Sequence, residues 1–195
     1  MRQPLLLAWY NDLPQRQRGE RTRTWNQRLR KALHDYGHRV QSRYFESALE
    51  NMLGWADADV RQAATLALGL TGAMDVNAAL AQRLHDDDPT VRQLAADALW
   101  SIWFRADTPD NNHELQRLIA LKLTADTRDS ILASYQALLQ KAPRFAEVYN
   151  QRAIVYYRLG EYTRAVADCD KVLRLNPYHF GAASGMAQCF MKQKK

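Results

Sequence analysis

The sequence predicts an all-α protein, a right-handed α-solenoid of antiparallel helix pairs, because two short patterns recur at fixed distances. The tripeptide Val-Arg-Gln at residues 60–62 returns 31 residues later at 91–93, and Pro143 returns 34 residues later as Pro177. Periods of about 20–50 residues are typical of stacked helical units, each of which buries its apolar face against its neighbours. Such a stack offers an extended surface rather than a deep pocket, so we expect a binding scaffold.

The composition favours a cytoplasmic chain without an integral membrane segment. Hydrophobic residues make up 47% of the 195 residues, which is enough for a sizeable core. No stretch approaches the roughly 20 apolar residues that span a bilayer, and the apolar run at 5–10 is shorter than a signal peptide's core of about 7–15 residues. Cys169 and Cys189 fall in helical segments without metal-ligand spacing, so buried thiols are expected.

Residues 1–44 form a basic N-terminal segment. They carry ten Arg or Lys against three acidic residues, a balance of +7, whereas the whole chain has a net charge of +6. A short helix or apolar arm is expected first, followed by a polar linker. Apolar residues then recur every three or four positions from Trp25 to Tyr44, the spacing of one amphipathic helix face. Gly37 is expected to break or bend that helix.

Two helix pairs are expected next, with helices at 45–53 and 60–70 and again at 78–84 and 91–104. Acidic groups stand just ahead of both second helices, where a carboxylate caps free N–H groups and meets the positive end of the helix dipole. Alanines follow the repeated tripeptide at matching places and let helices approach closely. This pattern resembles the HEAT repeat, including its short PBS-lyase-like form.

A different pattern follows toward the C-terminus. Ala153 is a small residue where two helices cross, Gly160 allows a turn with positive φ, and Pro177 blocks continuation of the second helix. These residues and the run Tyr-Tyr-Arg-Leu-Gly-Glu-Tyr at 156–162 resemble a tetratricopeptide repeat.

The 34-residue period also sets the expected domain organisation. Projected forward, it predicts a further first helix from about Phe180, which caps the stack. Projected backward, the tetratricopeptide pattern fits only the second helix of the preceding segment. We interpret that segment as a transition between the two repeat types. The expected parts are the basic segment 1–44, HEAT-like repeats 45–106, a transitional tetratricopeptide-like repeat 112–145, and a tetratricopeptide repeat with capping helix 146–195.

The sequence predicts a non-enzyme, with no catalytic residue, metal or cofactor. His34 and His38 stand one helical turn apart, as in zinc peptidases, but Asp35 is too short to replace the glutamate that acts there as general base. We therefore expect solvated histidines, and a metal-dependent hydrolase is a distant third hypothesis.

The tetratricopeptide resemblance implies a concave groove, lined by first helices, that binds a protein or an extended peptide. Asn150 is suited to bond a peptide main chain and Arg158 to pair with a carboxylate. The predicted groove residues are Glu147, Asn150, Ile154, Tyr157, Arg158, Ser184, Gln188 and Met191. A purely structural surface is the alternative.

The basic segment carries the second functional hypothesis, binding of nucleic acid or another polyanion. The residues proposed for it are Arg16, Arg18, Arg21, Arg28 and Lys31. The competing interpretation docks Trp25 on the first repeat and leaves the basic side chains solvated. The aromatic side chains at 99–104 are interpreted as filling the junction between the two repeat types, and a hot spot for partner binding is the alternative. An apolar face near Phe190 leaves open a homo-oligomer through the terminal helices.

Overall fold

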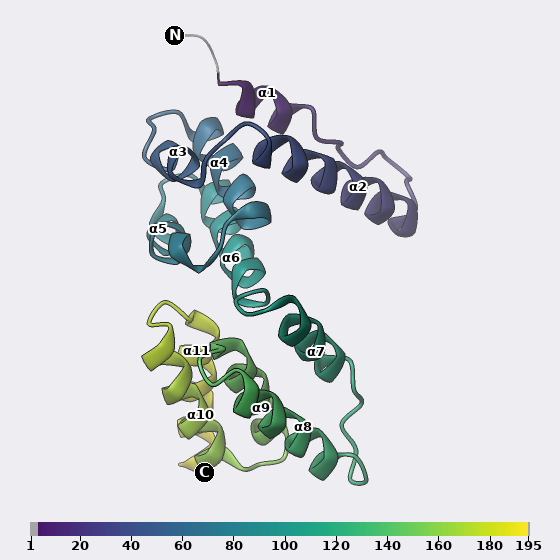
Figure 1. Cartoon of the computed structure of the whole chain (residues 1–195), viewed down its shortest axis with the longest axis vertical. Helices are drawn as coiled ribbons and strands as arrows, with labels where there is room; N and C mark the ends of the chain where they lie inside the picture. The colour runs from purple at the N-terminus through teal and green to yellow at the C-terminus, as the bar shows by residue number, and fades with distance from the viewer. Residues whose placement is uncertain (1–3, 195) are drawn as a thin grey trace. The chain divides into compact units, whose positions relative to one another are not determined.

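The computed structural model describes residues 4–194, and within that range its regular structure is helical, without β-strands. This confirms the all-α prediction. None of these helices is both long and apolar enough to cross a membrane. Figure 1 labels the helices, whose bounds are α1 (Leu5–Asn11), α2 (Thr22–Gln41), α3 (Glu46–Met52), α4 (Ala58–Thr71), α5 (Asn77–Gln82), α6 (Pro89–Trp103), α7 (Pro109–Ile119), α8 (Arg128–Lys141), α9 (Ala146–Arg158), α10 (Tyr162–Leu175) and α11 (Phe180–Gln193).

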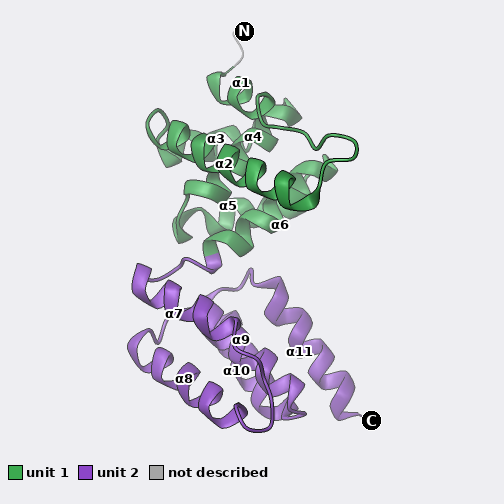
Figure 2. Ribbon diagram, turned by 90° about the vertical axis from the view of Figure 1, so that its right-hand side faces the viewer, with its two compact units in different colours: residues 1–102 green, residues 103–195 purple. Residues whose placement is uncertain are grey.

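The chain divides into two compact units, Met1–Ile102 and Trp103–Lys195 (Figure 2). In the first unit, α3 packs on α4, and both α1 and α2 also pack on α4. The core is formed mainly by small and branched apolar side chains of α4 and α6. Its fully buried members include Val60, Ala63, Ala64, Ala67, Leu68, Val91, Ala95, Leu99 and Ile102.

The duplicated tripeptide of the first unit has a duplicated geometry. Arg61 donates through Nη1 to the carbonyl oxygens six and five residues earlier, at 2.9 and 3.0 Å, and Arg92 does the same at 2.7 and 3.0 Å. The predicted acidic caps are also present, because Asp57 accepts from the N–H of Asp59 and Asp88 from that of Val91. The same residues therefore fix the turn before each second helix.

Gly37 does not break α2, and the expectation that it would is wrong. The helix continues from Thr22 to Gln41, and Gly37 is buried in it. A Cβ on Gly37 would lie 3.8 Å from Thr71 and 3.9 Å from Leu70, so this glycine lies against α4. Packing of α2 on α4 thus offsets the roughly 1 kcal/mol by which glycine weakens a helix interior.

In the second unit, α7 packs on α8, α8 on α9, and α10 on both α9 and α11. Gly160 has a φ of +77° in the turn between α9 and α10, as the sequence predicts. The last helix begins at Phe180, where the 34-residue period places it. Both cysteines are buried, and burial is the largest cause that raises the pKa of Cys169 to about 11.

Candidate partner-binding surfaces

The eight predicted groove residues lie on two neighbouring helices of the second unit, five on α9 and three on α11. The structure separates them by accessibility. Two are buried, and the other six are exposed or half-buried, namely Ile154, Tyr157, Arg158, Ser184, Gln188 and Met191. We call these six the α9–α11 row.

Glu147 and Asn150 do not belong to an accessible groove, so that part of the prediction is wrong. Glu147 is 1% exposed and Asn150 4%. The Glu147 carboxylate accepts hydrogen bonds from Asn150 Nδ2 at 3.0 Å, from Gln151 Nε2 at 2.7 Å and from His179 Nε2 at 2.8 Å. Because a buried carboxylate must be fully hydrogen-bonded, these donors hold it inside the unit and away from any partner.

His179 is the residue that closes this end of the groove, and the sequence analysis assigned it no role. Its Nδ1 accepts from the backbone N–H of Ala182 at 3.1 Å, which caps α11. The ring proton therefore sits on Nε2, and the imidazole donates it to Glu147. Trp103 stacks on the ring, with centroids 4.1 Å apart and planes 20° apart. Trp103 is 2% exposed, so it serves packing rather than a partner hot spot.

A largely buried ion pair fixes α9 on α10 and so orients the α9–α11 row. Arg152 donates through Nε and Nη2 to the two carboxylate oxygens of Asp168, at 2.8 and 2.7 Å. Its guanidinium also lies 5.7 Å from the ring centroids of both Tyr149 and Tyr156. Burial opposes the charged form of Arg152, but the bonds to Asp168 outweigh it and the pKa is raised.

The α9–α11 row combines apolar and polar side chains. Ile154 is 37% exposed and Met191 62%, while Gln188 donates to the Ser184 hydroxyl at 3.3 Å. Arg158 is exposed at the last turn of α9, and no carboxylate within residues 4–194 forms an ion pair with it. An uncommitted guanidinium beside exposed apolar side chains is suited to bind an anionic group.

The basic N-terminal segment is partly neutralised by its own chain. Arg28 pairs with Glu20 at 2.8 Å and Lys31 with Asp35 at 2.7 Å, while Arg16 donates to a carbonyl and a hydroxyl. The bond from Arg28 is the largest cause that lowers the pKa of Glu20. Of the five residues proposed for polyanion binding, only Arg18 and Arg21 are exposed with neither an ion pair nor a side-chain hydrogen bond among the described residues.

The unbroken α2 brings His34 and His38 together, with 3.1 Å between their Nε2 atoms and their rings nearly perpendicular. Both side chains are exposed. Among residues 4–194, however, no group of three or more His, Cys, Asp or Glu is placed to hold a metal ion. The pair is therefore a contact between two exposed imidazoles.

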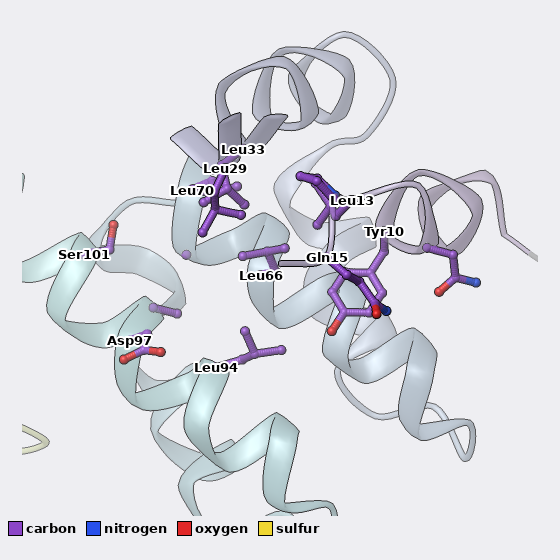
Figure 3. A pocket seen from close by; sticks show the side chains of 14 residues that line it. Tyr10, Leu13, Gln15, Leu29, Leu33, Leu66, Leu70, Leu94, Asp97 and Ser101 are labelled. Carbon is purple, nitrogen blue, oxygen red and sulfur yellow. The ribbon is translucent and has the colours of Figure 1, made fainter. Parts of the chain in front are cut away.

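The first unit contains a cleft of about 600 Å³ that sequence reasoning missed (Figure 3). Its floor is α4, its walls are α2 and α6, and the segment after α1 closes one end. Six half-buried leucines line it: Leu13, Leu29, Leu33, Leu66, Leu70 and Leu94. Their helical spacing is also that of core residues, so the sequence pattern alone does not distinguish a lined cleft from a filled core.

Two repeat families match the chain, one in each part. The family described as HEAT repeats matches residues 45–139, and the family described as tetratricopeptide repeat matches residues 146–179. The chain carries HEAT repeats and a tetratricopeptide repeat. The HEAT match continues through α7 into α8, across the segment interpreted from sequence as a transitional tetratricopeptide-like repeat, and that interpretation stays a prediction.

Two curated relatives match short stretches of the chain. A TPR repeat-containing protein of Rhizobium etli is 44% identical over 45 residues, which is 23% of this chain and 22% of that protein. The WD and tetratricopeptide repeats protein 1 of Mus musculus is 36% identical over 63 residues, 31% of this chain and 9% of that protein. The chain thus covers less than a quarter of the length of either relative. No solved structure gives a significant match.

Proposed function

We propose that this chain is a non-catalytic scaffold that binds a partner protein through an extended peptide laid across the α9–α11 row. The observation that carries the proposal is Arg158, an exposed guanidinium without an ion pair among the described residues, one helical turn from the exposed Ile154. HEAT and tetratricopeptide families are typically interaction scaffolds, and the matched segments support that class of function.

The row favours a peptide with one acidic group and apolar side chains on either side. Arg158 would pair with the carboxylate, while Ile154 and Met191 would contact apolar side chains. Ser184 and Gln188 offer hydroxyl and amide groups to the peptide main chain. Because Glu147 and Asn150 are buried, the peptide would begin one turn further along α9 than the sequence pattern predicts.

The test is an affinity capture from a native lysate with the intact chain, an Arg158→Glu variant and an Arg174→Glu control. Arg174 is exposed on α10, outside the row, and pairs with Asp170. We expect a captured protein that resists moderate salt, that is lost with Arg158→Glu and that is kept with Arg174→Glu. Equal capture by all three chains would refute the row as the binding surface.

The polyanion alternative is separated in the same experiment by an Arg18→Glu, Arg21→Glu variant. Deleting the basic segment would be a poor test, because α2 contributes the buried Tyr36 and Val40 to the first unit. Capture that is sensitive to nuclease and to salt, and that is lost only with the double variant, would favour nucleic acid over a peptide.

A further inference from the structure

The leucine-lined cleft of the first unit exists because α2 packs on α4 along only half of its length. The buried residues of α2, Tyr36, Gly37 and Val40, all lie in its last two turns. Leu33 and Leu29 lie one and two turns earlier on the same face and are only half-buried. The first half of α2 therefore stands away from α4, as Figure 1 shows, and leaves apolar surface accessible between α2 and α6.

The helices α4 and α6 are in close contact beneath the cleft. A Cβ on Gly69 would lie 2.8 Å from Cβ of Ala98, so the two helices nearly touch there. Leu66 and Leu70 stand on α4 near Gly69 in the sequence, and Leu94 on α6 lies below Leu66 in Figure 3. Small residues at the crossing and leucines around it form a groove shaped for apolar side chains from outside.

The polar groups of the cleft lie at its rim and are distributed asymmetrically. Asp97 and Ser101 lie at one end, and Gln15 lies at the other (Figure 3). Asp97 is exposed, and its carboxylate accepts from Gln93. No Lys or Arg among residues 4–194 forms an ion pair with Asp97. The rim thus favours a cationic group and disfavours an anionic one.

We propose that this cleft is a second docking site, which takes an amphipathic helix of a partner protein carrying a Lys or Arg opposite Asp97. The inference rests on the proposed scaffold function for its choice of partner class. Helix walls on two sides and an open top match the recognition mode in which a helix lays its apolar face into a groove. A volume of about 600 Å³ accommodates a ridge of apolar side chains at i, i+3, i+4 and i+7. A small ligand would need convergent polar groups, and here they stand at the rim.

The probe is a pair of fluorescent peptides of about four helical turns, held helical by an i, i+4 lactam. Both carry leucines at i, i+3, i+4 and i+7, and the flanking charges are lysines in one peptide and glutamates in the other. Binding to the full chain is measured by fluorescence anisotropy. We expect the lysine peptide to bind at least about threefold more tightly than the glutamate peptide, the size of a partly exposed ion pair.

Two matched pairs of variants locate the site. Leu94→Gln should weaken binding of the lysine peptide by about tenfold, whereas Leu5→Gln, an equally polar change at an exposed leucine outside the cleft, should leave it unchanged. Asp97→Lys should reverse the preference between the two peptides, and the exposed Asp75→Lys should not. Asp97 is on the surface, so its variant stays folded, as circular dichroism will show.

Three outcomes would overturn the proposal: no binding of either peptide, equal binding by wild type and Leu94→Gln, or a charge preference that survives Asp97→Lys. If dodecylammonium binds in a way that Leu94→Gln abolishes while neither peptide binds, the cleft takes a small cationic amphiphile instead. An Arg158→Glu variant should bind the lysine peptide normally, so failure of this site and failure of the α9–α11 row are distinguishable.

Discussion

The two units hold their helix pairs together by different means. In the first unit, charged side chains bind the turns between helices, as Arg61 does with two carbonyl oxygens and with Asp86. In the second unit, charged side chains lie inside the helix faces, where Glu147 and Arg152 meet buried partners. Helices of the first unit thus meet through small apolar residues, and helices of the second meet partly through ionic groups.

This difference determines where each unit is accessible. Because the buried Asp86 of the first unit makes its ion pairs at a turn, the helix faces around the cleft stay apolar, and leucines such as Leu66 and Leu94 remain available there. The second unit uses Glu147 and His179 to fill the beginning of its groove and leaves the end of α9 and the exposed residues of α11 open. We therefore expect the two units to differ in the substitutions that destabilise them.

The largest effect is expected for Glu147→Ala in the second unit. The substitution removes the acceptor of three hydrogen bonds and leaves the donors of Asn150 and His179 buried without it. Since each buried unsatisfied donor costs about 1–3 kcal/mol, the free energy of unfolding should fall by about 3 kcal/mol or more. Urea titration followed by circular dichroism measures it.

The control for that substitution is Glu114→Ala on α7. Glu114 forms a partly exposed pair with Arg117, three residues away on the same helix. Such pairs contribute at most about 1 kcal/mol, so the change should be small. If Glu114→Ala destabilised the chain as much as Glu147→Ala, the buried carboxylate would contribute no more than a partly exposed one, which would contradict the prediction.

Gly69→Ala should have the next largest effect, and it acts in the first unit. The new Cβ would lie 2.8 Å from Cβ and 3.0 Å from Cα of Ala98, and neither atom belongs to a flexible chain end. Overpacking of this kind costs about 1–3 kcal/mol. The matched control is Gly54→Ala, whose Cβ would meet its nearest atom at 3.6 Å. Equal urea midpoints for the two variants would show that α4 and α6 do not touch at this crossing.

Most of the fold follows from sequence, because repeat period, caps and turn residues are local signals. Asp57, Asp88 and Gly160 occupy the positions that their chemistry predicts, and α11 begins at Phe180 as the 34-residue period requires. The all-α class and both repeat types are confirmed on the same grounds.

The sites are predicted less well, because a helical face is read from spacing whereas burial depends on distant partners. Glu147 occupies a groove position in the repeat pattern, but His179, 32 residues away, covers it. Leu29 and Leu33 share a face with the buried Val40, and only the path of α2 distinguishes the cleft from the core. Gly37 was misjudged because helix propensity ignores the packing of α4.

The Arg61 and Asp86 pair is expected to make the stability of the first unit depend on pH. Burial of Asp86 disfavours its charged form, but hydrogen bonds from Arg61 outweigh that cost, and its pKa lies below the ordinary 3.8. Because the pKa of Asp86 is lower in the folded chain than in the unfolded chain, the group stabilises the fold. The full stabilisation is present at pH values above the unfolded pKa of about 3.9, and it is lost as the pH falls through the folded pKa.

Asp86→Asn tests this dependence. At neutral pH the free energy of unfolding should fall by about 1.5 kcal/mol, because a charged hydrogen-bond acceptor becomes neutral. The difference between wild type and variant should shrink as the pH falls below about 4, and urea titrations across that range measure it. A difference that stays constant with pH would mean that Asp86 contributes through packing rather than through its charge.

Gly37→Ala should produce the smallest effect, with a sign opposite to that of Gly69→Ala. Both glycines lie inside helices, so alanine gains about 0.5–1 kcal/mol in helix propensity at either position. At Gly37 the added Cβ meets Thr71 and Leu70 at 3.8 and 3.9 Å, which is ordinary contact, so the gain is retained and the urea midpoint should rise. If the midpoint falls instead, α2 lies closer to α4 than these distances allow, and the half-length packing that opens the leucine-lined cleft would have to be revised.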